Sequence, residues 1–252
     1  MTRALVERLV KLVKMFLTFE DRPSNSPYVE RLWRSYSTTG GPFHSMAEGN
    51  LELVVTRLGG FAQVTLRGPV TQAAIVDCPA DGRWFAIRFR VGTYFPGLPT
   101  SRLLDHRSLH LPTTRDGRFW LEGEAWEIPG YENAEVFVTR LAKRGVIAIE
   151  PAVEAVIEGA RHLLSRRSLQ RHFLRATGIT YAQFRKIERA RHAVELLRNG
   201  KGILDVVHDA GYFDQPHLTR SLKYLIGQTP VKIRQNDAQL SFSYKTEHSE
   251  PR

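Results

Sequence analysis

Three side chains near the end of the sequence, Gln215, Arg220 and Lys223, are of types that bind nucleic acid and lie within one predicted short helix. The fork of an arginine guanidinium pairs with the edge of a guanine, an amide pairs with adenine, and lysine or threonine binds phosphate. These residue types therefore suggest hydrogen bonding to DNA, not bond cleavage.

That helix must be positioned by a shorter one before it. One apolar stripe at helical spacing is formed by Ile203, Val206, Val207 and Ala210. Gly211 follows at once and can take the positive φ that ends a helix. Tyr212 and Phe213 are expected to anchor the turn.

The second helix is predicted to begin after Asp214, a good N-cap, with Pro216 in its first turn. Three leucines supply its buried stripe: Leu218, Leu222 and Leu225. The segment GQTP at 227–230 ends it. Two short helices joined at a glycine predict a helix-turn-helix.

A second copy of this pattern lies upstream. Ser165 can cap a helix that buries Leu169, Phe173 and Ala176, and Gly178 ends it. A connecting helix starts near Thr180, stops at Asn199-Gly200, and has an apolar stripe of Tyr181, Phe184, Ile187, Ala190, Val194 and Leu197. Its length of about 30 Å would let both units enter successive major-groove segments roughly 34 Å apart.

Residues 165–235 resemble the DNA-binding domain of the AraC/XylS family of bacterial transcription regulators. The matching segments, in the family's order, are SRRSLQRHF (165–173), Gly178, RARHAVELL (189–197), DAGYFDQPHLTRSLK (209–223) and GQTP (227–230). Two positions depart from the family. The stretch ARHLL at 160–164 lacks the expected glycine turn, and Val207 stands where the family prefers alanine.

The resemblance implies that the second helix of each unit reads bases. In the first unit these residues are Arg167, Gln170 and Arg171; in the second they are Gln215, Pro216 and Arg220. His217 and Thr219 are implied nearer the DNA backbone, and Lys223 is expected on phosphate. Pro216 offers only shape or an apolar contact.

Charge is concentrated in the same region. The chain has 252 residues and a net charge of +10, and residues 151–235 hold 15 Lys and Arg against seven Asp and Glu. A basic surface of this kind suits the release of counterions from phosphates.

The first half is predicted to be β-rich. Short β-branched or aromatic runs at 51–58, 62–66, 72–76 and 84–91 are separated by glycine-containing turns, and helices are expected near 101–104, 119–126 and 134–143. The arginines of Trp84–Arg90 are expected to be wet or to line a pocket. We expect an antiparallel sheet or small barrel.

This half is also similar, more loosely, to the sensor domains that precede AraC-type DNA-binding domains. The similar segments are PYVERLW (27–33), EGNLELVV (48–55) and IRFRVGTYFPGL (87–98). The resemblance implies a cupin-like β-barrel that binds a small effector or mediates dimerisation.

The first 20 residues form a separate amphipathic pattern. Leucines and Phe16 share one face in Met1–Phe19, while Lys11 and Lys14 interrupt the apolar core that a signal peptide needs. We expect an extension that packs on the protein; a membrane-surface helix and a start codon chosen too early are the alternatives. No run is long and apolar enough for a transmembrane helix.

No catalytic or metal motif accompanies the reactive side chains of the first half, which are His44, Asp77, Cys78, Asp105, His106 and His110. His106 and His110 have i, i+4 spacing, but Leu111-Pro112 argues against a helix there, and HExxH, CxxC and a phosphate loop are missing. Cys78 is the single cysteine, which suits a reducing cytoplasm. The acidic residues Glu122, Glu124 and Glu127 are expected on an exposed helix.

The sequence thus predicts an α+β protein. Its parts are an extension (1–20), an antiparallel β domain (27–145), an all-α double helix-turn-helix domain (150–235) and a tail (236–252) with strand-like alternation at 240–244. We predict a cytoplasmic, non-enzymatic regulator without cofactor or metal. Its expected partners are double-stranded DNA, a small effector, a second copy of the chain and, for an activator, RNA polymerase. The alternative is a small-molecule-binding or enzymatic β-barrel whose helical half serves assembly.

Overall fold

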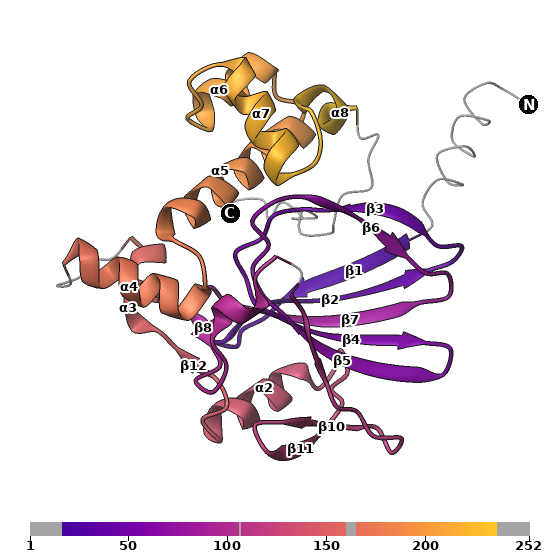
Figure 1. Ribbon diagram of the computed structural model, residues 1–252. Coiled ribbons are helices and arrows are strands. Elements are labelled where there is room, and N and C mark those ends of the chain that lie inside the picture. Colours follow the sequence, from indigo (N-terminus) through magenta and orange to yellow (C-terminus); the bar gives the residue numbers. More distant parts are fainter. Residues whose placement is uncertain (1–16, 106, 160–164, 236–252) are drawn as a thin grey trace, which may run out of the picture. The chain divides into compact units, whose positions relative to one another are not determined.

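A computed structural model describes residues 17–105, 107–159 and 165–235 (Figure 1). The chain divides into two compact units. Unit 1 comprises residues 1–42, 48–71 and 77–184; unit 2 comprises residues 43–47, 72–76 and 185–252. The amphipathic segment 1–16 and the tail 236–252 lie outside the described residues.

The main sheet of unit 1 is antiparallel and six-stranded, in the order β1-β2-β7-β4-β5-β9. Its strands are β1 (Leu17–Pro23), β2 (Val29–Ser37), β4 (Glu52–Leu58), β5 (Phe61–Arg67), β7 (Arg83–Phe89) and β9 (Leu109–Leu111). Gly59 and Gly60, both at positive φ, form the tight turn between β4 and β5. Among the described residues, β1 and β9 are not paired with each other, so the sheet is open.

The core of unit 1 lies on one face of this sheet. Leu53, Val55 and Ile87 are almost completely buried there and pack with α2 (Ala134–Lys143), which contributes Phe137, Val138 and Leu141. Figure 1 shows α2 and the β10–β11 hairpin together beside the sheet. The α+β class, with an antiparallel β-rich part followed by helices, is confirmed.

Three further strand pairs complete the β structure: β3 (Gly41–Ser45) with β6 (Ala74–Cys78), β8 (Thr93–Tyr94) with β12 (Ala148–Ile149), and β10 (Arg118–Leu121) with β11 (Glu124–Glu127). The strand expected at 72–76 is thus shifted to 74–78. A single 3₁₀ turn, η1 (Thr100–Leu103), takes the place of the helix expected at 101–104.

The helix predicted at 119–126 was wrong, because this segment is the β10–β11 hairpin. Glu122 and Gly123 have φ of 49° and 76°, the pair of positive values that a two-residue hairpin turn requires. Phe119 and Trp126 are therefore opposite each other and pack on Phe137. Residues 17–20, expected in the extension, belong to β1.

The expectation of an exposed arginine face on β7 is wrong for Arg88, which is only 4% exposed. Its guanidinium donates to Glu48 at 2.6 Å and to Glu52 at 2.9 Å. Burial opposes ionisation of Glu52, but Arg88 and the Trp33 indole N–H together hold the pKa of that carboxyl below its ordinary value. Arg88 is thus part of a buried ion-pair cluster of the sheet.

The helices of the second half are α3 (Pro151–Ile157), α4 (Arg166–Thr177), α5 (Tyr181–Arg198), α6 (Ile203–Asp209), α7 (Gln215–Leu225) and α8 (Pro230–Arg234). The predicted helices and their order are confirmed. The short helix α8 was missed, because Pro230 was taken only as a stop. Proline also suits a first helical turn, and Thr229 caps this one. No described helix has the length and apolarity needed to cross a membrane.

Candidate nucleic-acid interface and ligand cavity

Helices α4 and α7 are two copies of one capped helix, at an offset of 49 residues. The Ser165 hydroxyl accepts the N–H of Ser168 at 3.2 Å, and the Asp214 carboxylate accepts the N–H of His217 at 2.6 Å. The buried residues repeat at the same offset: Leu169, Phe173 and Ala176 in α4, and Leu218, Leu222 and Leu225 in α7. Gly178 and Gly227 end the helices at φ of 75° and 81°. The predicted caps and apolar stripes are confirmed.

The face of α7 opposite its leucines is open to solvent. Gln215, Pro216, Arg220 and Lys223 are exposed, and Thr219 is half-buried beside them. Because residues three or four apart share a helix face, Pro216, Arg220 and Lys223 form one row. Their contact with DNA stays a prediction, but none of these side chains is used to build the core.

His217 is held by the turn instead of lying free on the helix surface. Its ring makes an edge contact with Tyr212, with centroids 5.2 Å apart, and its Nδ1 lies 3.4 Å from the N–H of Phe213. Tyr212 is buried, as expected. Phe213 was wrongly expected to anchor the turn, since it is 90% exposed.

Arg189 on α5 was not singled out from the sequence, although it supports the same turn. Its guanidinium lies 4.7 Å from the centre of the Tyr212 ring and donates to the Gly211 carbonyl at 3.3 Å. The Tyr212 hydroxyl lies 3.1 Å from that of Ser221. Burial raises the pKa of Tyr212 despite these polar neighbours. A buried tyrosine and a stacked arginine thus fix the geometry between α6 and α7.

The C-terminal end of α7 is fastened by segments far away in the sequence but within unit 2. The N–H of Ala47 donates to the Leu225 carbonyl at 2.7 Å, and that of Ala73 donates to the Tyr224 carbonyl at 2.9 Å. A Cβ at Gly227 would lie 2.9 Å from His44 Nδ1 and 3.3 Å from the Ala73 Cβ. The N–H groups of Ala47 and Ala73 thus satisfy carbonyls that the end of a helix leaves unpaired.

The corresponding face of α4 presents Arg167, Gln170 and Arg171, all exposed. Arg171 stands at the position of Arg220 in α7, and Leu174, 47% exposed, stands at the position of Lys223. The two exposed faces therefore share one arginine position and differ elsewhere. Residues 160–164, where the family's glycine turn is missing, lie outside the described residues.

Helix α4 is held in unit 1 by polar contacts at its far end. The Glu150 carboxylate lies 3.0 Å from His172 Nδ1 and is paired with Arg175. Burial alone would raise the pKa of Glu150, but these two partners hold it below its ordinary value. The Thr100 hydroxyl donates to the Ala176 carbonyl at 3.0 Å. A Cβ at Gly178 would lie 3.1 Å from the backbone of Thr100 and Ser101.

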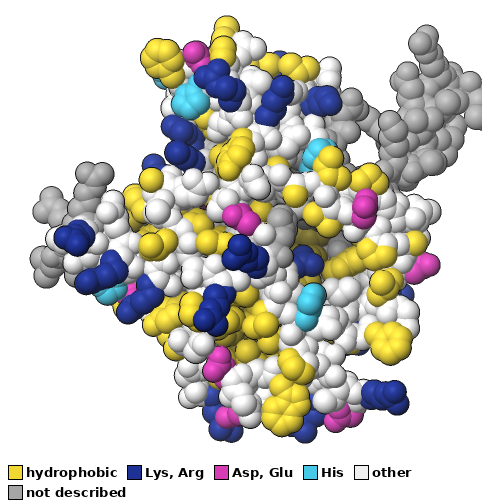
Figure 2. All heavy atoms as spheres, viewed as in Figure 1, with side chains coloured by type: hydrophobic (Ala, Val, Ile, Leu, Met, Phe, Trp, Pro, Cys, Tyr) yellow, Lys and Arg dark blue, Asp and Glu magenta, His cyan; other side chains and the backbone are white. Residues whose placement is uncertain are grey.

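Basic side chains gather over these helices. Figure 2 shows Lys and Arg side chains over α4 in unit 1 and over the α6–α8 region in unit 2. Some acidic residues of the region form local ion pairs: Asp209 pairs with Lys201, and Glu188 lies 3.2 Å from Arg191.

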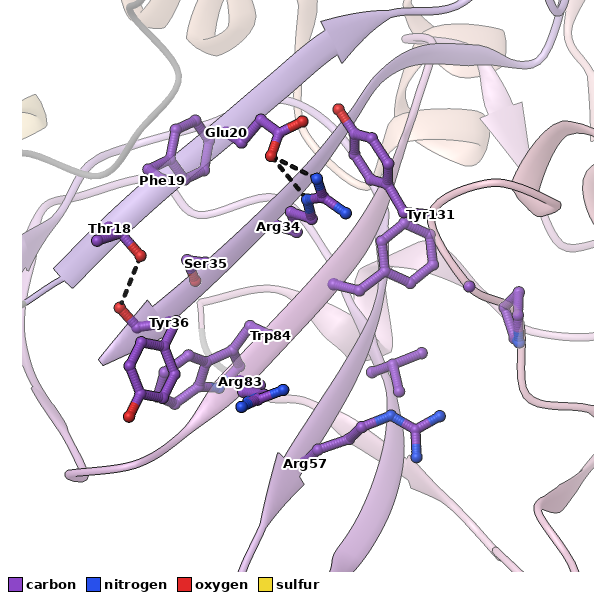
Figure 3. A pocket seen from close by; sticks show the side chains of 14 residues that line it. Thr18, Phe19, Glu20, Arg34, Ser35, Tyr36, Arg57, Arg83, Trp84 and Tyr131 are labelled. Carbon is purple, nitrogen blue, oxygen red and sulfur yellow. Dashed lines mark hydrogen bonds and ion pairs between the residues drawn. The ribbon is translucent and has the colours of Figure 1, made fainter. Parts of the chain in front are cut away.

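A cavity of about 500 Å³ opens on the sheet of unit 1 (Figure 3). Its lining residues come from β1, β2, β4, β7 and the loop before α2, and they include Thr18, Glu20, Arg34, Tyr36, Arg57, Arg83, Trp84 and Tyr131. The Glu20 carboxylate accepts from Arg34, whose guanidinium lies 4.5 Å from the centre of the Tyr131 ring. Sequence reasoning missed this site, because the arginines within Trp84–Arg90 that were expected to be exposed or to line a pocket do not line this cavity.

The described reactive side chains of the first half do not assemble into a metal site, and His106 lies outside the described residues. Within the residues that the structure describes, no three His, Cys, Asp or Glu side chains are close enough to hold an ion. His110 lies on β9, with Nδ1 3.0 Å from the Thr65 hydroxyl. Cys78 is buried, and burial raises the pKa of its thiol. Glu122, Glu124 and Glu127 are exposed as expected, although on the hairpin.

Comparison with known proteins identifies the helical half. Residues 160–236 match a family model described as a helix-turn-helix domain. No curated protein matches the chain. Among solved structures, ToxT from Vibrio cholerae aligns over 89% of this chain and 100% of its own, at 9% identity and a TM-score of 0.41. ToxT bound to (E)-4-(8-methylnaphthalen-1-yl)but-3-enoic acid aligns over 86% and 98%, at 8% identity and a TM-score of 0.41.

Proposed function

We propose that this chain, whose residues 160–236 match a helix-turn-helix domain of the AraC type, is a sequence-specific DNA-binding transcription regulator. The observation that carries the proposal is the repeated capped helix. Arg171 in α4 and the equivalent Arg220 in α7 lie on the face opposite the buried stripe. Exposed guanidinium groups on a short helix of this kind suit hydrogen bonding to base edges in the major groove.

In this proposal each unit reads part of the operator. Arg167, Gln170 and Arg171 on α4 contact one segment, and Gln215, Pro216 and Arg220 on α7 contact the other. His217 and Thr219 lie nearer the phosphates, and Lys223 binds one of them. The packing of His217 against Tyr212 favours a positioning role for its ring, with Nε2 left to donate to a phosphate.

A small effector that modulates DNA binding is the second part of the proposal. The cavity of about 500 Å³ on the sheet of unit 1 has the size of known small-molecule sites. Both α4 and α7 also end on segments from the first half of the chain, through Thr100 in unit 1 and through Ala47 and Ala73 in unit 2. A ligand that shifts these segments would act on the ends of the reading helices. A homodimer and contact with RNA polymerase remain predictions from the family resemblance.

The test is selection of bound sequences from a random duplex library by the purified full chain, at about 150 mM salt. We expect one enriched motif with two half-elements roughly 10 base pairs apart. A single short element would restrict base reading to one unit. Absence of any enriched motif, together with DNA binding that salt abolishes, would overturn the proposed regulator function.

The matched control for the selection is Arg144→Ala. Arg144 carries the same charge as Arg220 but lies at the exposed end of α2, 3.4 Å from Glu124. This variant should enrich the same motif as the wild type. If it loses the motif, the selected binding depends on overall charge and not on the reading helices.

A further inference from the structure

We propose that the cavity of unit 1 binds a small organic anion with an apolar body, and that Arg57 and Arg83 bind its charged group. Only the ligand's role as an effector rests on the proposed regulator function; the binding site itself does not.

The first argument is the register of the two arginines. Arg57 on β4 and Arg83 on β7 are directly opposite each other in the antiparallel ladder, so their side chains leave the same face of the sheet within about 5.5 Å between Cβ atoms. Two like charges in this arrangement repel each other. An anion placed between them would turn this repulsion into two favourable contacts.

The second argument is the lack of an internal counter-charge. Within the described part of the chain, neither Arg57 nor Arg83 has a carboxylate within 4.0 Å. The single acidic lining residue, Glu20, is paired with Arg34 on the same face. Arg83 instead lies 5.4 Å from the centre of the Tyr36 ring. The positive charge of the cavity is therefore available to a ligand.

The third argument is the apolar floor beside the charges. Val55 and Phe85, both buried, lie opposite each other in the same β4–β7 ladder, two positions from the arginine pair and on the same face. Tyr131 meets Phe85 edge-on, with ring centroids 6.2 Å apart. Figure 3 shows Arg34, Arg83 and Arg57 on neighbouring strands, with the Tyr131 ring beside Arg34. This arrangement suits a ligand with one charged end and an apolar or aromatic body.

The test compares two fluorescent probes that share an aromatic skeleton: 8-anilinonaphthalene-1-sulfonate, an anion, and N-phenyl-1-naphthylamine, which lacks the sulfonate. Both are titrated into the full chain at low salt, where exposed charges act most strongly. We expect stoichiometric binding of the sulfonate, and at least roughly tenfold weaker binding to an R57Q/R83Q variant, from lost charge-assisted hydrogen bonds. The neutral amine should bind both proteins equally.

Three further proteins complete the design. R115Q removes an exposed arginine of unit 1 outside the cavity and should leave sulfonate binding unchanged. R57Q and R83Q as single variants should each weaken sulfonate binding, which covers the case in which the double variant does not fold. Unchanged sulfonate affinity in the folded variants, or equal weakening of both probes, would overturn the anion site.

A parallel measurement separates this site from the regulator. Without probe, R57Q/R83Q should bind the selected duplex as tightly as the wild type, because the cavity arginines are not in the reading helices. If the wild type selects no DNA but binds the sulfonate through these arginines, the regulator fails and the anion site stands. A change in DNA affinity when the sulfonate is added supports the effector role.

Discussion

The main-chain carbonyls of Ala176 and Leu225, at equivalent positions in α4 and α7, each accept a hydrogen bond from the first half of the chain. Ala176 receives the Thr100 hydroxyl at 3.0 Å, and Leu225 receives the Ala47 N–H at 2.7 Å. The two helices thus resemble each other also in that a carbonyl at each C-terminal end accepts a hydrogen bond from outside the helix. Each of these two helices is held at its C-terminal end by a hydrogen bond from the first half of the chain, while its N-terminal end carries its own side-chain cap.

We expect Thr100→Val to lower the free energy of unfolding by about 1–3 kcal/mol, because it leaves the carbonyl of buried Ala176 without this donor while preserving volume. Urea denaturation of the two proteins measures the difference. Thr139→Val, which removes a hydroxyl bonded at 2.8 Å to the Glu135 carbonyl on an exposed helix face, is the control. An equal loss of unfolding free energy in both variants would mean that the buried Thr100 hydrogen bond contributes no more than an exposed one.

Substitutions on α7 should separate base reading from phosphate binding. Arg220→Ala should cost about 1–3 kcal/mol at the native site and relax the preference at one base position. Lys223→Ala should weaken binding to all sequences alike and reduce the slope of log affinity against log salt by about 1. Titrations of matched and mismatched duplexes at several salt concentrations measure both. If Arg220→Ala binds the native site unchanged, the orientation of α7 on DNA is wrong.

The ligand-free protein should become more stable when one of the two cavity arginines loses its charge. Arg57→Gln removes one of two like charges opposite each other on β4 and β7, which we expect to add about 0.2–1 kcal/mol to the free energy of unfolding. The gain should shrink as salt rises, because exposed charges are screened. Thermal melts at low and high salt, with Arg115→Gln as control, measure it. A loss of stability specific to Arg57→Gln would show that Arg57 has a favourable partner in the folded protein.

Acid should weaken the attachment of α4. The pKa of Glu150 lies below its ordinary value of 4.5, since His172 and Arg175 favour the ionised carboxylate. A depressed pKa means that the stabilisation is fully present above the unfolded value and is lost as pH falls through the folded one. The contribution of the Glu150 carboxylate is therefore present above about pH 5, and it is lost progressively as the pH falls below about 4.5.

The measurement is the free energy of unfolding from pH 6 to pH 3 in wild type and Glu150→Gln. Other carboxyls with lowered pKa, such as Glu135, contribute to the acid slope of both proteins, so the difference between the curves is the informative quantity. It should fall towards zero at the acid end. A constant difference across the range would assign the effect of the substitution to packing.

The sequence predicts the helices of the second half well, because caps, stops and a 3.6-residue period are local signals. Ser165, Asp214 and Gly178 all act where those signals place them. The β10–β11 hairpin was missed because the apolar pattern of this segment also fits a helix. The positive φ values of Glu122 and Gly123, which form the turn, favour the hairpin instead.

Other features depend on residues far apart in the chain, which a single sequence does not connect. Arg88 is buried because Glu48 and Glu52 meet it across the sheet, and α7 ends on Ala47 and Ala73. The pairing of Arg57 with Arg83 likewise follows only from the register of β4 and β7. Local periodicity therefore finds the candidate reading helices but not the cavity or the fastening of the helix ends.

The unequal faces of α4 and α7 have a consequence for the geometry of an operator. Arg171 and Arg220 are equivalent, but Leu174 replaces Lys223, and Arg167 replaces Pro216. A single chain that uses both helices would meet two different half-elements in a fixed order, so its site would have a direction and not be a palindrome. Inverting such a site would reverse the orientation of the bound protein on the chromosome. The orientation of the site would then determine which of the two neighbouring genes the protein faces.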